Sequence, residues 1–272
     1  MTAVATATAS TAEARPRRAL ASPVPLSRIV RVELRKMFDT RSGFWLMASI
    51  LILSVIATAA VILFAPDEEI VYSNFGAAFG FPMAVILPLI ALLSVTSEWS
   101  QRSGLTTFTL VPHRGRVILA KAVAAVAVGV VSMGIAFGVG ALGNVIGAAI
   151  TGMPQVWDVS ATEVGLVVLG NVIGMLVGFT LGLLIRNSPG AVVSYFVLTF
   201  VLPGVTELLA ASQEWFRDAR GWLDPNYAQG PLFAFEGAPT AEQWANLGVT
   251  TAYWFVLPLM VALWFVRRSE VK

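Results

Sequence analysis

Most of the side chains that could do chemistry together lie in one polar stretch, residues 98–116. It contains Glu98, Arg102, several Ser and Thr hydroxyls, Arg114, and His113, the single histidine of the chain. One acid, one imidazole and dispersed cations are too few ligands for a metal site. The stretch is also too polar to cross a membrane, so we expect a short surface helix that Pro112 ends.

Other catalytic chemistry is missing as well. The chain has no cysteine, which excludes disulfides, iron–sulfur clusters and thiolate zinc sites. It has no GxxxxGK[ST] phosphate loop, and no Ser, His and Asp can be grouped at membrane depth. We therefore expect a protein that is not an enzyme and binds no cofactor. Any uphill work would need an energy source outside this chain.

The elements around this stretch belong to a membrane protein. Of the 272 residues, 57% are hydrophobic and 12% charged, whereas soluble domains are about 45–50% apolar and about 25% charged. We predict an all-α fold in which residues 43–272 form a single six-helix transmembrane domain. The spans are predicted at about residues 44–64, 75–97, 117–150, 164–185, 190–210 and 247–266.

Local signals refine these spans. Ser160 with Glu163, and Thr240 with Gln243, predict capping boxes ahead of the fourth and sixth spans. The third is longer than a bilayer of about 30 Å needs, so it must tilt, project, or break near the glycines of residues 140–147.

Ionisable groups are absent from the middle of the spans, where ion-coupled carriers place them. The polar Asn144, Asn171 and Glu207 lie toward the outer ends, and we interpret them as interfacial residues.

The N-terminal region divides in two. Residues 1–25 have the composition of a disordered cytoplasmic tail. Residues 26–42 form an amphipathic helix with Arg28, Arg31 and Arg35 on its polar face. Its apolar face consists of Leu26, Ile29, Val30, Leu34 and Met37. This pattern indicates a helix at the inner membrane surface, near anionic headgroups. A helix packed on a partner protein is the alternative.

The distribution of positive charge predicts the orientation. With six spans, every Lys and Arg except Arg217 and Arg220 lies on the same side of the membrane as the two termini. Basic loops stay in the cytoplasm, so we expect both termini inside and a location in the plasma membrane. The basic residues form no patch on a soluble face, so nucleic acid is not an expected partner.

Small residues recur every fourth position in two spans. They are Gly134 and Gly138 in the third span, and Gly170, Gly174, Gly178 and Gly182 in the fourth. This spacing aligns glycines on one helix face and lets two backbones approach closely. We predict a helix–helix seam, within or between subunits.

The loop after the second span resembles that of the permease subunits of ABC-2 type ABC transporters. In that family the second helix ends in Glu, a Gly and a hydroxyl-rich stretch follow, and Pro-x-Arg precedes a third helix with an early Lys. The matching positions here are Glu98, Gly104, Thr106, Thr109, Leu110, Pro112, Arg114 and Lys121. Leu105 and His113 depart from the usual pattern, where Thr and a small hydroxyl residue are common. The amphipathic N-terminal helix and the six-span plan also fit this family.

The resemblance implies an architecture like that of type V exporters. Residues 98–116, with Trp99 and Arg102 among them, would be the coupling helix that docks on a separate ATPase subunit. Two ATPase copies would bind ATP and magnesium. A second permease copy, identical or a close paralogue, would complete the path within the membrane lipid.

The resemblance also assigns a role to the outer connection before the last span. Residues 204–245 would re-enter the membrane as short helices forming an outer gate, with Pro203, Gly204, Glu207 and Trp215 among its residues. Pro203 and Gly204 would break the fifth helix there. A simple extracellular loop is the alternative.

The expected function is therefore the permease subunit of an ABC exporter for a lipid-like or amphipathic cargo. Two other functions stay open: a secondary carrier, and a membrane assembly or scaffold subunit that transports nothing.

Overall fold

The computed structural model describes residues 24–39, 41–100 and 114–268. Within these ranges the chain forms helices and no strands, and six helices are long and apolar enough to span a membrane. The chain is thus an all-helical, multi-pass membrane protein, as its composition predicts. Its first half consists of α1 (Leu26–Asp39), α2 (Arg41–Phe64), the short η1 (Asp67–Glu69), α3 (Tyr72–Ser100), α5 (Arg114–Thr151) and α6 (Ala161–Ile185).

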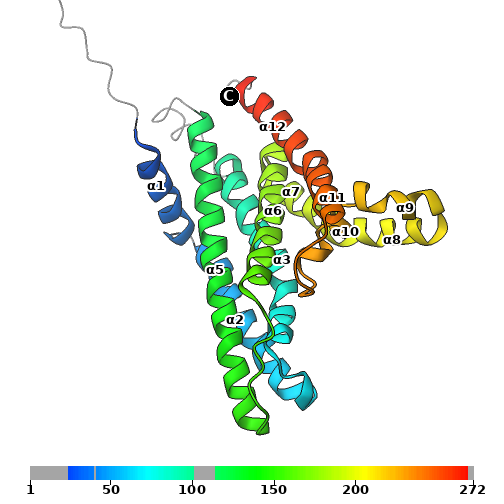
Figure 1. The fold of residues 1–272 in the computed structure, drawn as a ribbon. Helices are drawn as coiled ribbons and strands as arrows, with labels where there is room; N and C mark the ends of the chain where they lie inside the picture. The colour runs from blue at the N-terminus through cyan, green and yellow to red at the C-terminus, as the bar shows by residue number, and fades with distance from the viewer. Residues whose placement is uncertain (1–23, 40, 101–113, 269–272) are drawn as a thin grey trace, which may run out of the picture.

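The second half is divided more finely. It consists of α7 (Ser188–Phe196), η2 (Val197–Val201), α8 (Leu202–Ser212), α9 (Glu214–Leu223), α10 (Pro225–Gln229), η3 (Gly230–Leu232), α11 (Ala241–Thr251), η4 (Ala252–Val256) and α12 (Leu257–Arg268). The end of α12 and the start of α5 lie at the same end of the bundle (Figure 1). We call this end, where α3 stops and α5 begins, the loop end.

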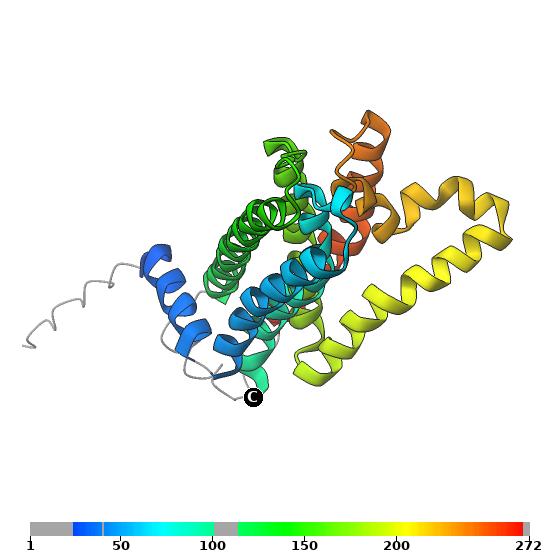
Figure 2. The ribbon, with the colours of Figure 1, turned by 90° about the horizontal axis from the view of Figure 1, so that it is seen from below.

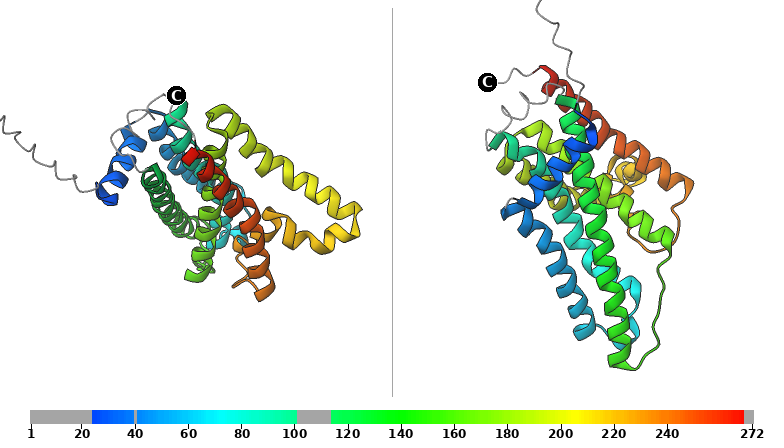
Figure 3. Two further views of the ribbon diagram at one scale, coloured as in Figure 1. Left: turned by 90° about the horizontal axis from the view of Figure 1, so that it is seen from above. Right: turned by 90° about the vertical axis from the view of Figure 1, so that its left-hand side faces the viewer.

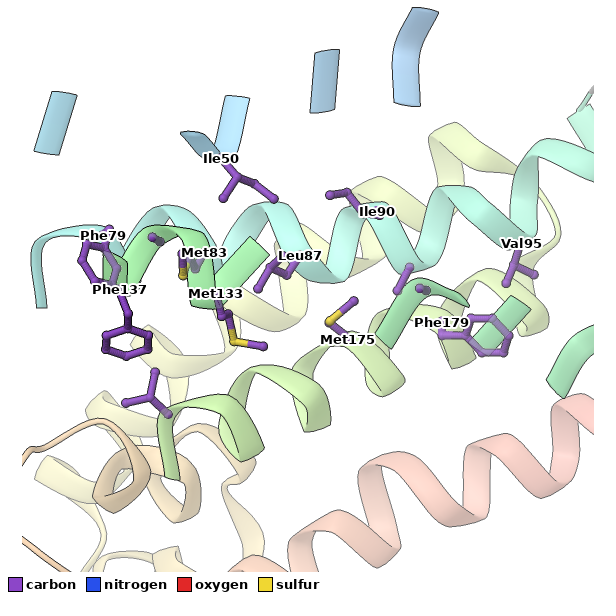
Figure 4. Close-up of a cluster of buried hydrophobic side chains, with 14 of the residues drawn as sticks. Ile50, Phe79, Met83, Leu87, Ile90, Val95, Met133, Phe137, Met175 and Phe179 are labelled. Atoms are coloured by element: carbon purple, nitrogen blue, oxygen red, sulfur yellow. The ribbon is translucent and has the colours of Figure 1, made fainter. Parts of the chain in front are cut away.

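Helix α3 lies at the centre of the bundle and contacts α2, α5, α6 and α7. Figure 4 shows the core that results, with Leu87 of α3, Met133 of α5 and Met175 of α6 among its fully buried side chains. The rings of Phe79 and Phe137 meet edge to face, with centroids 5.4 Å apart. Apolar side chains thus cover several faces of the central helices, which is typical of helices surrounded by lipid and other helices.

Helix α5 is continuous, so of the three alternatives for this long span the break near residues 140–147 does not occur. Its 38 residues correspond to about 57 Å, well beyond a bilayer of about 30 Å. The glycines in this stretch admit neighbouring side chains: Gly143 lies against Thr58 and Phe75, and Gly147 against Ile70. They therefore serve close packing with α2 and the start of α3 rather than a helix break.

Both predicted capping boxes are confirmed. The Ser160 hydroxyl accepts the Glu163 backbone N–H, and the Glu163 side chain returns to the backbone of Ser160. Thr240 and Gln243 make the same reciprocal pair ahead of α11. Each box satisfies amide groups that the first helical turn leaves without partners.

The fifth apolar segment passes through Pro203, which corrects the predicted break at Pro203 and Gly204. Because proline has no N–H, the hydrogen-bond register shifts by one residue: the Leu202 N–H bonds to Val197 O in a π turn, and α8 continues to Ser212. The same arrangement precedes Pro258, where the Leu257 N–H bonds to Ala252 O. Phe-Val-Leu-Pro stands at both places, residues 200–203 and 255–258.

Past this π turn the fifth segment leaves the bundle. Helix α7 is attached to α3, where the Tyr195 hydroxyl donates to Ala84 O (2.5 Å) and the Ser188 hydroxyl donates to the Thr96 hydroxyl oxygen (2.8 Å). Helix α8 then projects sideways, and α9 folds back along it (Figures 1 and 2). We call α8 and α9 the hairpin.

Candidate functional site

The candidate site is the loop end, which bounds the polar stretch predicted to dock on an ATPase. Arg102, Gly104, Thr106, Thr109 and Pro112 lie outside the described residues. Glu98 belongs to the last turn of α3 and Arg114 is the first residue of α5, but their side chains also lie outside the described part of the chain. Of the predicted coupling residues, the structure therefore describes the side chains of Trp99 and Lys121.

Trp99 attaches the end of α3 to the end of α6. Its indole is partly buried against the main core, and the Arg186 guanidinium carbon lies 5.8 Å from the ring centroid. Arg186 caps α6 in a left-handed conformation, with φ of 54°, and its Nε donates to Leu183 O (3.4 Å). A cation over an indole face is attractive. The turn that leads into the loop is thus held by a neighbouring helix.

Lys121 lies on the other side of the loop and forms a buried ion pair. Its Nζ is 2.5 Å from Oε2 of Glu33 in α1, and both side chains are only 5% exposed. The same Nζ donates to Ser94 O of α3 (3.2 Å). The second oxygen of the carboxylate, Oε1, accepts a hydrogen bond from Lys36 (2.8 Å). One ammonium group therefore joins α1, α3 and α5.

Glu33 was not among the residues predicted to act at this site. A signal for it exists in the sequence, because Glu33 stands four residues after Ile29 and four before Met37, inside the apolar stripe of α1. A charge in an apolar stripe indicates a buried partner. The apolar stripe does not show which distant Lys or Arg is the partner of Glu33.

The two faces of α1 are those predicted, but the apolar face packs within the chain. Ile29 is buried, and the stripe lies on α5 and α2, as the crossing of α1 over α5 in the right-hand view of Figure 3 shows. The face with Arg28, Arg31 and Arg35 is exposed. This exposed side also presents Val32 and Phe38.

The glycines of α6 lie against the centre of the bundle. A Cβ on Gly178 would be 2.7 Å from Pro88 O, and one on Gly182 would be 2.9 Å from Leu92 O, so both glycines pack on the α3 backbone. Gly174 faces Pro88 less closely, and Gly170 accommodates the ring of Phe233. By contrast, Gly134 and Gly138 of α5 have no heavy atom within 4 Å of such a Cβ. They take no part in a seam within the described chain.

The residues predicted to form an outer gate are divided among short helices. Pro203, Gly204 and Glu207 belong to α8, and Trp215 of α9 is exposed. The Glu207 carboxylate lies 2.8 Å from the Arg220 guanidinium, which also bonds Asp224 (3.2 Å) and covers the ring of Tyr227.

In this network the pKa of the Arg220 guanidinium is raised above its ordinary value. Partial burial alone would lower the pKa of its guanidinium, but hydrogen bonds and charge from Glu207 and Asp224 outweigh burial and raise it. Arg220 is thus a permanent cation that joins α8, α9 and α10.

Asn144, one of the polar residues predicted to lie at the membrane interface, is fully buried within the chain. Its amide nitrogen donates to Val156 O (3.0 Å) and ties the connection between α5 and α6 to α5.

Within the described ranges, no three His, Asp or Glu side chains come together in a way that could hold a metal ion. The described chemistry of the site is therefore charge pairing and helix positioning. Neither the protein-family models nor the curated proteins include a match to the chain.

Proposed function

We propose that the chain is the membrane-spanning permease subunit of an ABC-2 type exporter. In this proposal residues 98–116 dock on a separate ATPase subunit. The main support is the position of that polar stretch, with its family-like motif, between the second and third of six apolar helices. A loop that receives force must have firm ends. Trp99 with Arg186, and Lys121 with Glu33 and Ser94, supply such ends.

The proposed orientation has the loop end in the cytoplasm. Helix α1 with its three arginines, the start of α5 and the end of α12 lie toward that end (Figure 1). Arg217 and Arg220 are in α9 of the hairpin instead. Positive residues favour the cytoplasmic side, so both termini would be inside the cell and the protein would lie in the plasma membrane.

Helix α1 would lie at the inner membrane surface, and its packing on α5 determines which of its sides can face lipid. Because its apolar stripe faces α5, contact with lipid would use the exposed side, where Arg28, Arg31 and Arg35 are interleaved with Val32 and Phe38. Each basic side chain near an anionic surface contributes about 1 kcal/mol.

The complete transporter would contain two ATPase subunits, which bind ATP and magnesium, and a second permease copy or close paralogue. The chain itself would form the walls of the path. Such apolar walls suit a lipid-like or amphipathic cargo that enters from the cytoplasm or inner leaflet. The segment of residues 204–245, which the structure divides into short helices, would close the outer side.

Purification of the tagged full-length chain from its native membranes tests this proposal. We expect an ATPase subunit with a phosphate-loop motif to co-purify and to hydrolyse ATP in the complex. Glu98→Ala and Arg102→Ala should uncouple that hydrolysis from export or weaken the complex, whereas the exposed outer substitution Arg217→Ala should not. The proposal is wrong if no ATPase co-purifies and both loop variants keep full activity.

A further inference from the structure

The Glu33–Lys121 pair has an unusual location for two full charges. Lys121 belongs to a candidate membrane span, Gly115–Thr151, and both side chains are 5% exposed. A charge removed from water at such a place is costly unless it is paired and hydrogen-bonded. Ionisable groups inside membrane helices are for this reason treated as candidates for a functional role.

The pair also lies next to the two helix ends that border the polar loop. Ser94 lies in the last two turns of α3, which lead into the loop, and Lys121 lies in the first turns of α5, which follow it. The Lys121 ammonium therefore connects α1 to the described helical turns on both sides of this stretch. The carboxylate at its other side comes from α1, whose own chain neighbours are far from the loop in sequence.

Each half of the pair has a second polar partner on its own side. The Glu33 carboxylate also holds Lys36 of α1, and the Lys121 ammonium also holds the Ser94 carbonyl oxygen of α3. If α1 separated from α5, neither charge would be left entirely without compensation.

We propose that Glu33 is a positioning residue that acts through Lys121. Their ion pair joins α1 to the loop-end turns of α3 and α5, so that the three move as one unit. The attachment of α1 to α3 and α5 follows from these contacts. Its role in ATP-driven movement rests on the proposed function. Helix α1 then moves together with the end of α3 and the start of α5 at the membrane surface.

Distance measurement by pulsed electron paramagnetic resonance tests the joining. Because the chain has no cysteine, spin labels can be placed at Val32 of α1 and Val123 of α5, both exposed. We expect a narrow distance distribution in the wild type in lipid nanodiscs. Glu33→Gln and Lys121→Met should raise the displaced population of α1 at least about tenfold, which corresponds to about 1.4 kcal/mol.

Two variants show whether the pair itself is responsible. Lys36→Met removes the other, half-exposed partner of the same carboxylate and should leave the distribution narrow. The charge-swapped double variant Glu33→Lys with Lys121→Glu should hold α1 more tightly than either charge-neutralising single variant. Labels at Val130 of α5 and Leu169 of α6 control for damage to the bundle. Narrow distributions in both single variants would overturn the proposal.

Nucleotide dependence separates positioning from simple stabilisation. With a co-purified ATPase and a non-hydrolysable ATP analogue, the distance from Val32 to Val123 should stay constant in the wild type and change in Glu33→Gln. A change in the wild type would show that α1 does not move with α5. If no ATPase co-purifies and both loop variants keep full activity, the proposed function fails, while the resting distances still decide whether the pair joins the helices. The same spin-label distance, measured from position 32 to position 123 in isolated native membranes, gives the comparison for any variant that does not survive purification.

Discussion

The loop end and the start of α9 in the hairpin place charge in opposite environments. At the loop end the Glu33 and Lys121 side chains are each 5% exposed, whereas in the hairpin Glu214 and Arg217 are 84% and 57% exposed. The exposed pair is screened by water and contributes about 0–1 kcal/mol. Loss of one partner from the buried pair leaves a charge that the interior cannot solvate. Similar residue types thus restrict helix positions strongly in one region and weakly in the other.

Helix packing is also tighter in the bundle than in the segment that leads into the hairpin. In the most apolar part of α6, 56% of the residues are buried inside the chain, against 11% in the most apolar part of Ser188–Ser212. The glycines of α6 bring its backbone onto α3, while α8 packs chiefly on α9 and η2. We infer that the bundle is held by long-range contacts and the hairpin by local ones, and three comparisons test this difference.

The largest effect should come from Lys121→Met. Within the described part of the chain, it leaves the buried Glu33 carboxylate with the half-exposed Lys36 as its remaining cationic partner. The free energy of unfolding should therefore fall by about 3–5 kcal/mol. Denaturant unfolding in detergent micelles measures this loss. The double variant Glu33→Met with Lys121→Met should recover most of it, because both charges of the buried pair are then removed. Wild-type stability of the single variant would contradict the contrast between the two regions.

A smaller effect is expected from Gly178→Ala in the seam between α6 and α3. The new Cβ would meet Pro88 O at 2.7 Å, and a backbone atom in a packed helix moves little, so a loss of about 1–3 kcal/mol is expected. Gly134→Ala is the matched control, because open space surrounds that position, and it should change stability by no more than about 0.5 kcal/mol. Equal effects of the two substitutions in the same unfolding assay would show that the close approach is unimportant.

The smallest effect should come from the hairpin itself. Arg220→Ala removes the cation that joins Glu207 of α8 to Asp224, and local stability should fall by about 1.5 kcal/mol. Hydrogen exchange of α9 amides should then accelerate roughly tenfold, with α6 unchanged. Arg217→Ala, which removes only an exposed pair, should stay within about 0.5 kcal/mol. Acceleration in α6 as well would show that the hairpin and the bundle are one cooperative unit.

Much of this fold is predictable from residues close together in the chain. The apolar runs of the six spans, the two faces of α1, and the capping boxes at Ser160 and Thr240 depend on periodicity and short-range hydrogen bonds. Each is formed within a few residues, so local spacing is enough to identify it. The candidate site was predictable only as a polar loop between two spans.

Long-range packing decided the rest. Whether α5 breaks at its glycines depended on the side chains of Thr58 and Phe75 that fill the space beside Gly143. Whether Pro203 ends its helix depended on the π turn that absorbs the missing donor. Asn144 is buried because the connection after α5 folds back over it.

The sequence by itself determined that the chain crosses a membrane and that Glu33 interrupts an apolar stripe, since composition and spacing are local properties. Only the tertiary structure decided that the carboxylate meets Lys121, 88 residues away. The reason is physical. A buried charge requires a counter-charge within a few ångströms, and which one arrives depends on how α1, α3 and α5 pack together.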